Sequence, residues 1–327
     1  LRQRMGLRSL AFAAPPVQVP NGWETYIFRF QIASQPELPP ALAQPLVLRL
    51  YSSPQGLPRL HHEFAAQERM AALDYPVARP LLLEASSDHF GGPFMLMEEV
   101  PGRTLVDLLL ARPWCIVRGP ARMADLHTRL HRLPTAGFPA PPEPLLGRSL
   151  TELDRLIEEE NMPGLRPGLE WLCQHRPPDP ERPAVLHLDF HPLNLLFDGP
   201  RRATVLDWCE WDVGDYHADV ATTMILFKSV ALEWHGIWQN LARWPGRFVL
   251  LYGYLEAYHK QLRLDRHRLR YYFTWAALRR LGRYGRWLHS TPQSMGCRPS
   301  LVEHLDPDGI DRLRYCFRRW SGVNVML

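Results

Sequence analysis

The stretch His187–Phe197, which reads HLDFHPLNLLF, constrains the fold of this chain more than any other. It follows the apolar run Ala184–Leu186, which predicts a buried strand, yet it contains two His, one Asp and one Asn within eight positions. Polar side chains beside a buried strand are costly unless each one finds a partner. The stretch therefore predicts a polar loop with a functional role at the end of a buried strand.

A second polar feature follows this loop directly. Asp198–Gly199 lies between two apolar runs, a pattern that favours a β-hairpin. Such a hairpin places Asn194 at the start of one strand and Asp207 at the end of the next, so that both open on the same side, with Asp189 in the preceding loop. We expect these two carboxylates and one amide to converge without a nearby Lys or Arg. Hard oxygen ligands of this kind suit Mg²⁺.

The remaining sequence divides into two parts with different patterns. Residues 17–100 contain β-branched and aromatic runs separated by turn residues, and these predict strands with one intervening helix. The expected strands are Trp23–Phe30, Pro45–Tyr51, Ala78–Ala85 and Gly91–Val100, and the expected helix is Leu60–Leu73.

From residue 103 onward the pattern is mostly helical. One helix is expected to open at Ser149, because Glu152 follows three residues later and completes a capping box. We therefore predict an α+β fold with two lobes. Residues 1–100 would form a small β-rich lobe of an antiparallel sheet plus one helix. Residues 101–327 would form a larger, mainly α-helical lobe that holds the polar hairpin.

Composition excludes several classes of protein. With 46% hydrophobic and 22% charged residues, the chain fits a soluble globular protein, and no apolar run reaches membrane-spanning length. The start of the sequence has no clear signal-peptide pattern. The five cysteines lack CxxC spacing, which favours reduced thiols and a cytoplasmic location. Residues 228–327 carry 17 Lys and Arg against 7 Asp and Glu. No nucleic-acid motif accompanies this basic region, so we expect neither a nucleic-acid nor a membrane partner.

The polar stretch has a specific resemblance. His187, Asp189 and Asn194 have the spacing H-x-D-x-x-x-x-N of the kinase catalytic loop, and Asp207 stands where kinases carry the metal-binding Asp of D-F-G. Together with the later Gly214–Asp219, GDYHAD, this resembles the aminoglycoside phosphotransferase/choline kinase-like family, which has a protein-kinase-like fold. The resemblance extends over residues 17–290 and is strongest over 184–220.

The resemblance implies a role for each matching residue. Asp189 would orient a substrate hydroxyl and accept its proton, while Asn194 and Asp207 would hold Mg²⁺. His187 would brace the backbone of the loop, and the role of His191 stays open. The implied activity is a small-molecule kinase, a phosphotransferase that uses ATP or GTP to phosphorylate an alcohol group of a metabolite or antibiotic.

In the β-rich lobe the resemblance implies a nucleotide site. Arg49 occupies the position of the phosphate-binding strand Lys, and Glu63 would be its ion-pair partner, with Glu68 a less suitable substitute. The Gly-rich loop is reduced to Gly22, and the segment MLMEEVPG resembles the hinge between lobes. The implied nucleotide-binding residues are Arg49, Glu63, Gly22, Met97 beside the adenine, and the backbone of Glu98 and Val100.

Two other functions remain open at this stage. His187, Asp189 and His191 also form H-x-D-x-H, which is compatible with a metallohydrolase. Alternatively, Arg49 in the Lys position and the sparse glycine loop are compatible with a kinase-shaped binding module that has lost catalysis. The acceptor is equally open. Aminoglycosides are polycations, and the basic residues 228–327 argue against them, so we predict weak or no activity on kanamycin-like drugs.

Overall fold

The computed structural model describes residues 10–19, 25–52, 56–139, 141–199, 202–229, 237–289 and 307–327. The chain divides into two compact units. The smaller unit comprises the chain up to Gly102 together with Thr204–Cys209, and the larger one is formed mainly by Arg103–Ala203 and Glu210–Ser290. The short segment Thr204–Cys209 therefore belongs to the smaller unit, although it follows Arg103–Ala203 of the larger unit in the sequence.

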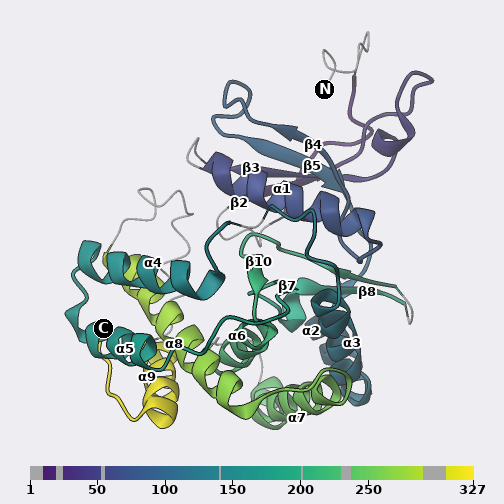
Figure 1. Ribbon diagram of the computed structural model, residues 1–327. Helices are drawn as coiled ribbons and strands as arrows, with labels where there is room; N and C mark the ends of the chain where they lie inside the picture. The colour runs from purple at the N-terminus through teal and green to yellow at the C-terminus, as the bar shows by residue number, and fades with distance from the viewer. Residues whose placement is uncertain are drawn as a thin grey trace. The chain divides into compact units, whose positions relative to one another are not determined.

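The smaller unit is built on a five-stranded antiparallel sheet with the strand order β1-β2-β3-β5-β4 (Figure 1). The strands are β1 (Val17–Val19), β2 (Thr25–Phe30), β3 (Leu46–Tyr51), β4 (Pro80–Glu84) and β5 (Phe94–Glu98). Strand β3 is central, and Arg49 lies in its middle, opposite Ile27 on β2 and Met95 on β5. Pro80, which cannot donate a ladder hydrogen bond, begins the edge strand β4.

One long helix, α1 (Leu57–Ala72), covers this sheet and contacts β4 and β5. Its buried positions follow each other at helical spacing, and they are Leu60, Glu63, Ala66, Gln67 and Met70. Glu63 is thus a carboxylate on the buried face of a helix. Such a charge is stable only when it is paired and hydrogen-bonded.

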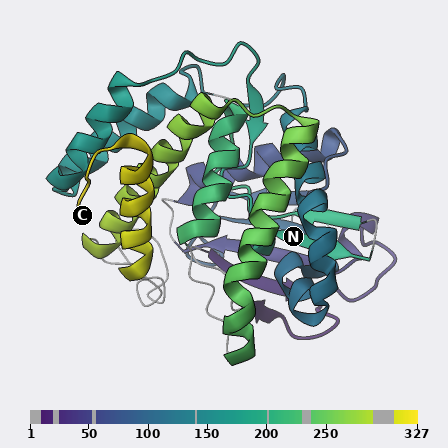
Figure 2. The same ribbon diagram turned by 90° about the horizontal axis from the view of Figure 1, so that it is seen from below.

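The larger unit is mainly helical (Figures 1 and 2). Its helices are α2 (Leu105–Ala111), α3 (Gly119–His131), α4 (Leu145–Glu159), α5 (Arg166–Gln174), α6 (Tyr216–Ser229), α7 (Ile237–Gln261), α8 (Arg266–His289) and α9 (Pro307–Ser321), with 3₁₀ turns at Pro113–Val117, Pro163–Leu165 and Pro192–Asn194. Helix α3 packs along α7, and α8 packs between α6 and α9. Helix α6 is buried on nearly all sides, which fits its apolar sequence and puts it at the core of the unit.

Short strands frame the polar loop in the larger unit. Strand β7 (Ala184–Leu186) pairs with β10 (Asp212–Gly214), and β6 (Arg103–Thr104), β8 (Leu195–Asp198) and β9 (Arg202–Val205) form a three-stranded sheet. The loop runs from the end of β7 to the start of β8. Gly199, at φ 73°, turns the chain from β8 toward β9, a backbone conformation that glycine adopts without strain.

The predicted α+β class is confirmed, but the predicted start of α4 is wrong. The helix begins at Leu145, one turn before Ser149, and Pro144 is its N-cap. Burial explains the difference, because Leu145, Leu146 and Ser149 all lie on the buried face of the longer helix. Ser149 Oγ accepts a hydrogen bond from the indole of Trp275 at 2.9 Å instead of capping the helix.

Among the described helices, none combines the length and the apolar character that a membrane span requires.

Candidate active site

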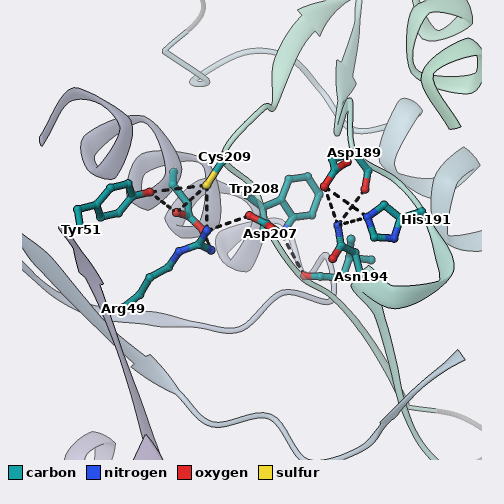
Figure 3. Close-up of polar contacts among 10 residues, drawn as sticks. Arg49, Tyr51, Asp189, His191, Asn194, Asp207, Trp208 and Cys209 are labelled. Atoms are coloured by element: carbon teal, nitrogen blue, oxygen red, sulfur yellow. Dashed lines mark hydrogen bonds and ion pairs between the residues drawn. The ribbon is translucent and has the colours of Figure 1, made fainter. Parts of the chain in front are cut away.

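The polar loop of the larger unit brings Asp189, His191 and Asn194 together (Figure 3). The side-chain nitrogen of Asn194 donates to Asp189 Oδ2 and to the Asp189 carbonyl, both at 3.0 Å. His191 Nε2 lies 3.5 Å from Asp189 Oδ2 and 3.2 Å from the Asn194 nitrogen. The Asp189 side chain remains 28% exposed, so its carboxylate is held in position and is still reachable from solvent.

The backbone on the N-terminal side of Asp189 is strained and firmly held. Leu188 has φ 58°, a left-handed conformation that costs a bulky residue free energy and persists only where its surroundings fix it. His187 is completely buried, and its Nδ1 accepts the Asp189 N–H at 3.2 Å. His187 therefore contacts the backbone of the loop, not a site open to substrate.

Asp219, in the first turn of α6, fixes this strained segment. Its carboxylate accepts the N–H of His187 at 2.5 Å and that of Leu188 at 2.8 Å. The same carboxylate lies 2.9 Å from His127 Nε2 and 3.1 Å from His131 Nε2, both on α3. All three side chains are buried. The two histidines were not predicted from the sequence, although their spacing of four in LHTRLHRL puts both on one helix face.

A second polar cluster lies within the smaller unit (Figure 3). Arg49 Nη1 pairs with Glu63 Oε1 at 2.7 Å, and Arg49 Nη2 pairs with Asp207 Oδ1 at 3.0 Å. The other Glu63 oxygen accepts the hydroxyl of Tyr51 at 2.8 Å, and Cys209 Sγ lies 3.4 Å from it. The planar guanidinium of Arg49 thus pairs with two carboxylates at once, a geometry that suits a lysine ammonium less well.

Burial dominates the electrostatics of this cluster. It raises the pKa of Glu63, an effect that the nearby Arg49 charge and the hydrogen bond from Tyr51 oppose. Burial also raises the pKa of the Cys209 thiol well above its usual value, so that Cys209 stays protonated at neutral pH. Tyr51 and Cys209 were not predicted as members of this cluster. Their positions, two residues after Arg49 and two residues after Asp207, are the signal that could have revealed them.

The expectation that no Lys or Arg lies near the converging oxygen ligands is wrong for Asp207. Arg49, which is 158 residues away in sequence, reaches it from β3. Asp207 adopts φ 63°, a left-handed conformation that Asp tolerates, and its side chain is 41% exposed. An exposed carboxylate of this kind suits Mg²⁺, which keeps several waters. In the larger unit, the nitrogen of Asn194 is committed to Asp189, so Asn194 would offer its amide oxygen to a cation.

The remaining residues of the expected nucleotide site lie at the end of β5 and in the loop after it. Met97 is 7% exposed and packs in an apolar cluster with Tyr51 and Met95. The N–H of Glu98 donates to the Arg79 carbonyl at 3.0 Å, so Glu98 has only its carbonyl to offer a base. Val100 packs at the margin of the same cluster. Gly22 lies outside the described residues.

The metallohydrolase hypothesis, based on H-x-D-x-H, does not match the positions of the metal-ligating atoms. Two groups in the described part of the chain bring three metal-ligating atoms together, His127 with His131 and Asp219, and Glu63 with Asp207 and Cys209. Neither group contains His187, Asp189 or His191. The His187 ring is instead occupied by the backbone of its own loop.

Solved structures with the same fold include aminoglycoside phosphotransferases and amicoumacin kinase. A thermostable mutant of aminoglycoside phosphotransferase APH(4)-Ia superposes with a TM-score of 0.66 over 98% of each chain, at 17% identity. The same enzyme has been solved with ADP and hygromycin B, with a TM-score of 0.63 and 18% identity over 99% of this chain and 98% of that one. Amicoumacin kinase hAmiN, in complex with AMP-PNP, Ca²⁺ and Ami, gives a TM-score of 0.58 at 13% identity over 94% of this chain and 88% of that one.

Curated relatives share sequence over part of their length. Acyl-CoA dehydrogenase family member 11 of Gallus gallus is 28% identical over 213 residues, and its Pongo abelii counterpart is 26% identical over 192 residues. These matches cover 58% and 54% of this chain, and the chain spans about a quarter of the length of these relatives. The model of the phosphotransferase enzyme family, APH, matches residues 17–272. With its kinase-like fold and a family match over most of its length, the chain belongs to this family of small-molecule phosphotransferases.

Proposed function

We propose that this phosphotransferase moves the γ-phosphoryl group of ATP or GTP to a hydroxyl of a small molecule, with Asp189 as the base. The observation that carries the proposal is the Asp189 carboxylate. It is pinned by Asn194 at 3.0 Å, rests on a strained backbone that Asp219 holds, and is still 28% exposed. A carboxylate fixed at the end of such a loop can orient an acceptor hydroxyl for in-line attack.

The proposed step balances in atoms and charge. Asp189 accepts the proton of the acceptor hydroxyl as its oxygen forms a bond to the γ-phosphorus. The bond from that phosphorus to the β,γ-bridging oxygen breaks, and the nucleoside diphosphate leaves. Asn194 and Asp207 would hold Mg²⁺, which when bound offsets negative charge on the phosphate oxygens. His187 would act only by keeping the loop backbone in place, and His191 lies near enough to Asp189 to steady its carboxylate.

The smaller unit would bind the nucleotide. Arg49 would contact phosphate oxygens while Glu63 holds its guanidinium, and Met97 would line the base pocket. The carbonyl of Glu98 and the N–H of Val100 would hydrogen-bond the base. Gly22 stays a proposed phosphate-loop residue. Glu63 holds the Arg49 guanidinium through Nη1, so Nη2 could release Asp207 and bind a phosphate oxygen in its place. This arrangement favours Arg49 as a phosphate ligand.

The test is nucleotide consumption across a library of hydroxylated compounds. Wild-type protein with Mg·ATP should form ADP with at least one acceptor, and Asp189→Asn should lower that turnover by about 10²- to 10⁴-fold. Asp198→Asn, at the exposed end of β8, is a matched control that should leave turnover unchanged. Full activity of Asp189→Asn would remove Asp189 as the base.

A further inference from the structure

The backbone of the polar loop is held on both sides of Asp189 by one face of α6. On the N-terminal side, the Asp219 carboxylate accepts the N–H groups of the two residues that precede Asp189. On the C-terminal side, the hydroxyl of Thr223 donates to the carbonyl of Phe190 at 2.9 Å. Asp219 and Thr223 are four residues apart, so their side chains lie on the same face of the helix.

Phe190 is fixed by its ring as well as by its carbonyl. The ring is completely buried and stacks on the ring of His127, with the centroids 4.0 Å apart and the planes 12° apart. Thr223 is also completely buried, so water cannot replace its hydroxyl at the carbonyl without a rearrangement of packed side chains. With Asp219 on the other side, the backbone of Asp189 therefore lies between two fixed points.

The neighbouring threonine on the same helix, Thr222, has a different partner. Its hydroxyl donates to the Ala218 carbonyl at 2.8 Å, which belongs to the preceding turn of α6. Both threonines are buried, but the hydrogen bond of Thr223 leaves the helix and reaches a carbonyl 33 residues away in sequence. The Thr223 hydroxyl therefore connects α6 to the loop, whereas that of Thr222 stays within α6.

We propose that Thr223 is a positioning residue for phosphoryl transfer, because its hydroxyl holds Phe190 and thereby keeps the Asp189 carboxylate in the orientation that in-line attack requires. The inference rests on the proposed function, in which Asp189 is the base. Thr223 touches neither reactant and acts through the loop backbone. A displacement of about 1 Å in a reacting group lowers a rate by about 10²-fold, so the loss of this hydrogen bond should be visible in kcat.

The first test replaces each threonine by valine, which keeps the branched shape of the side chain and removes the hydroxyl. Thr223→Val should lower kcat by about 10- to 100-fold. Its KM for Mg·ATP should stay near the wild-type value, because most of the proposed nucleotide contacts belong to the smaller unit. Thr222→Val should keep the wild-type kcat. Thr223→Ser, which restores the hydroxyl, should recover most of the loss.

The assays are run well below the melting temperature of each variant, so that unfolding does not contribute to the loss. If Thr223 only stabilised the fold, the folded Thr223→Val protein would turn over at the wild-type rate, and the proposal would be wrong. Equal losses in Thr223→Val and Thr222→Val would also overturn it, because they would show a general effect of the helix.

Hydrogen exchange tests the hold on the loop without any turnover. Amide exchange is followed by mass spectrometry in peptides that cover residues 187–194, with peptides of α3 as the reference for global unfolding. Thr223→Val should speed exchange in the loop relative to α3, and Thr222→Val should not. Unchanged loop exchange in Thr223→Val would reject the inference, even if kcat fell.

The two measurements keep this inference distinct from the proposed function. Turnover that requires Asp189 but is the same in the wild type and in Thr223→Val would uphold the kinase and reject the role of Thr223. Faster loop exchange in Thr223→Val, without phosphorylation of any acceptor by the wild type, would support the hold of Thr223 on the loop while the proposed function failed.

Discussion

At the scale of single residues, Ser149 has a role in the core that differs from the role predicted for it. Its hydroxyl accepts the Trp275 indole N–H, and Trp275 is completely buried. Replacing Ser149 by Ala should leave this donor unsatisfied and lower the free energy of unfolding by about 1–3 kcal/mol. Urea unfolding measures the loss.

The control for this prediction is Glu152, the other half of the expected capping box. Glu152 is exposed on α4, so Glu152→Ala should change the free energy of unfolding by less than about 0.5 kcal/mol. A costly Glu152→Ala would mean that the capping box operates and that the helix start described above is wrong, whereas a neutral Ser149→Ala would contradict the role of its hydroxyl as the acceptor of Trp275.

At the scale of elements, three helices meet around one buried carboxylate. Helix α3 contributes His127 and His131, α6 contributes Asp219, and α7 contributes Tyr254 and Tyr258. The tyrosine hydroxyls lie 2.7 and 2.5 Å from the Nδ1 atoms of the two histidines. When each hydroxyl donates to Nδ1, both histidines are neutral and the Nε2–H of His131 is directed to Asp219 at 3.1 Å. His127 Nε2 lies 2.9 Å from Asp219 but makes no hydrogen bond within the described residues. Asp219 in turn accepts the backbone N–H groups of His187 and Leu188.

This arrangement predicts that acid weakens the fold. Burial lowers the pKa of His127 to about 4, although Asp219 pulls in the other direction. The usual value in an unfolded chain is about 6.5. Between these values the unfolded state binds a proton that the folded state does not, so the free energy of unfolding falls as the pH falls. Between pH 7 and pH 5 the loss from this residue should be about 2 kcal/mol. Urea titrations across that range measure it.

Variants separate this histidine from the rest of the chain. His127→Gln removes the titration, so its stability should be lower at pH 7 and should depend less on pH than that of the wild type. His89→Gln, at an exposed loop position, should keep the wild-type slope. An unchanged slope in His127→Gln would assign the acid sensitivity to other groups.

At the scale of the whole molecule, the features that could be predicted from the sequence are those set by residues close together in the chain. The periods of 2 and 3.6 reflect which face of an element is buried, so they located β2, β3, β4, β5 and α1 of the smaller unit, whereas the short edge strand β1 was not predicted. The spacing of Asp189 and Asn194 is equally local, because one loop carries both. The missed residues depend on partners that are distant in sequence. His131 meets Asp219 across 88 residues, and Trp275 meets Ser149 across 126. No local pattern encodes such a contact, and only packing brings the partners together.

The last prediction concerns the chain as a nucleotide-binding protein, and it separates an active kinase from a kinase-shaped module. A ligand that binds only the folded state at 100 times its Kd stabilises that state by about 2.7 kcal/mol. Mg·ATP should therefore raise the melting temperature by about 5 °C, and omission of Mg²⁺ should remove much of this shift. Asp207→Asn should abolish the part that depends on Mg²⁺, because it removes a proposed ligand. Asp189→Asn should keep the whole shift while it loses turnover, because its carboxylate acts on the acceptor. No shift in the wild type would exclude nucleotide binding, and a shift without turnover of any acceptor would make the chain a binding module.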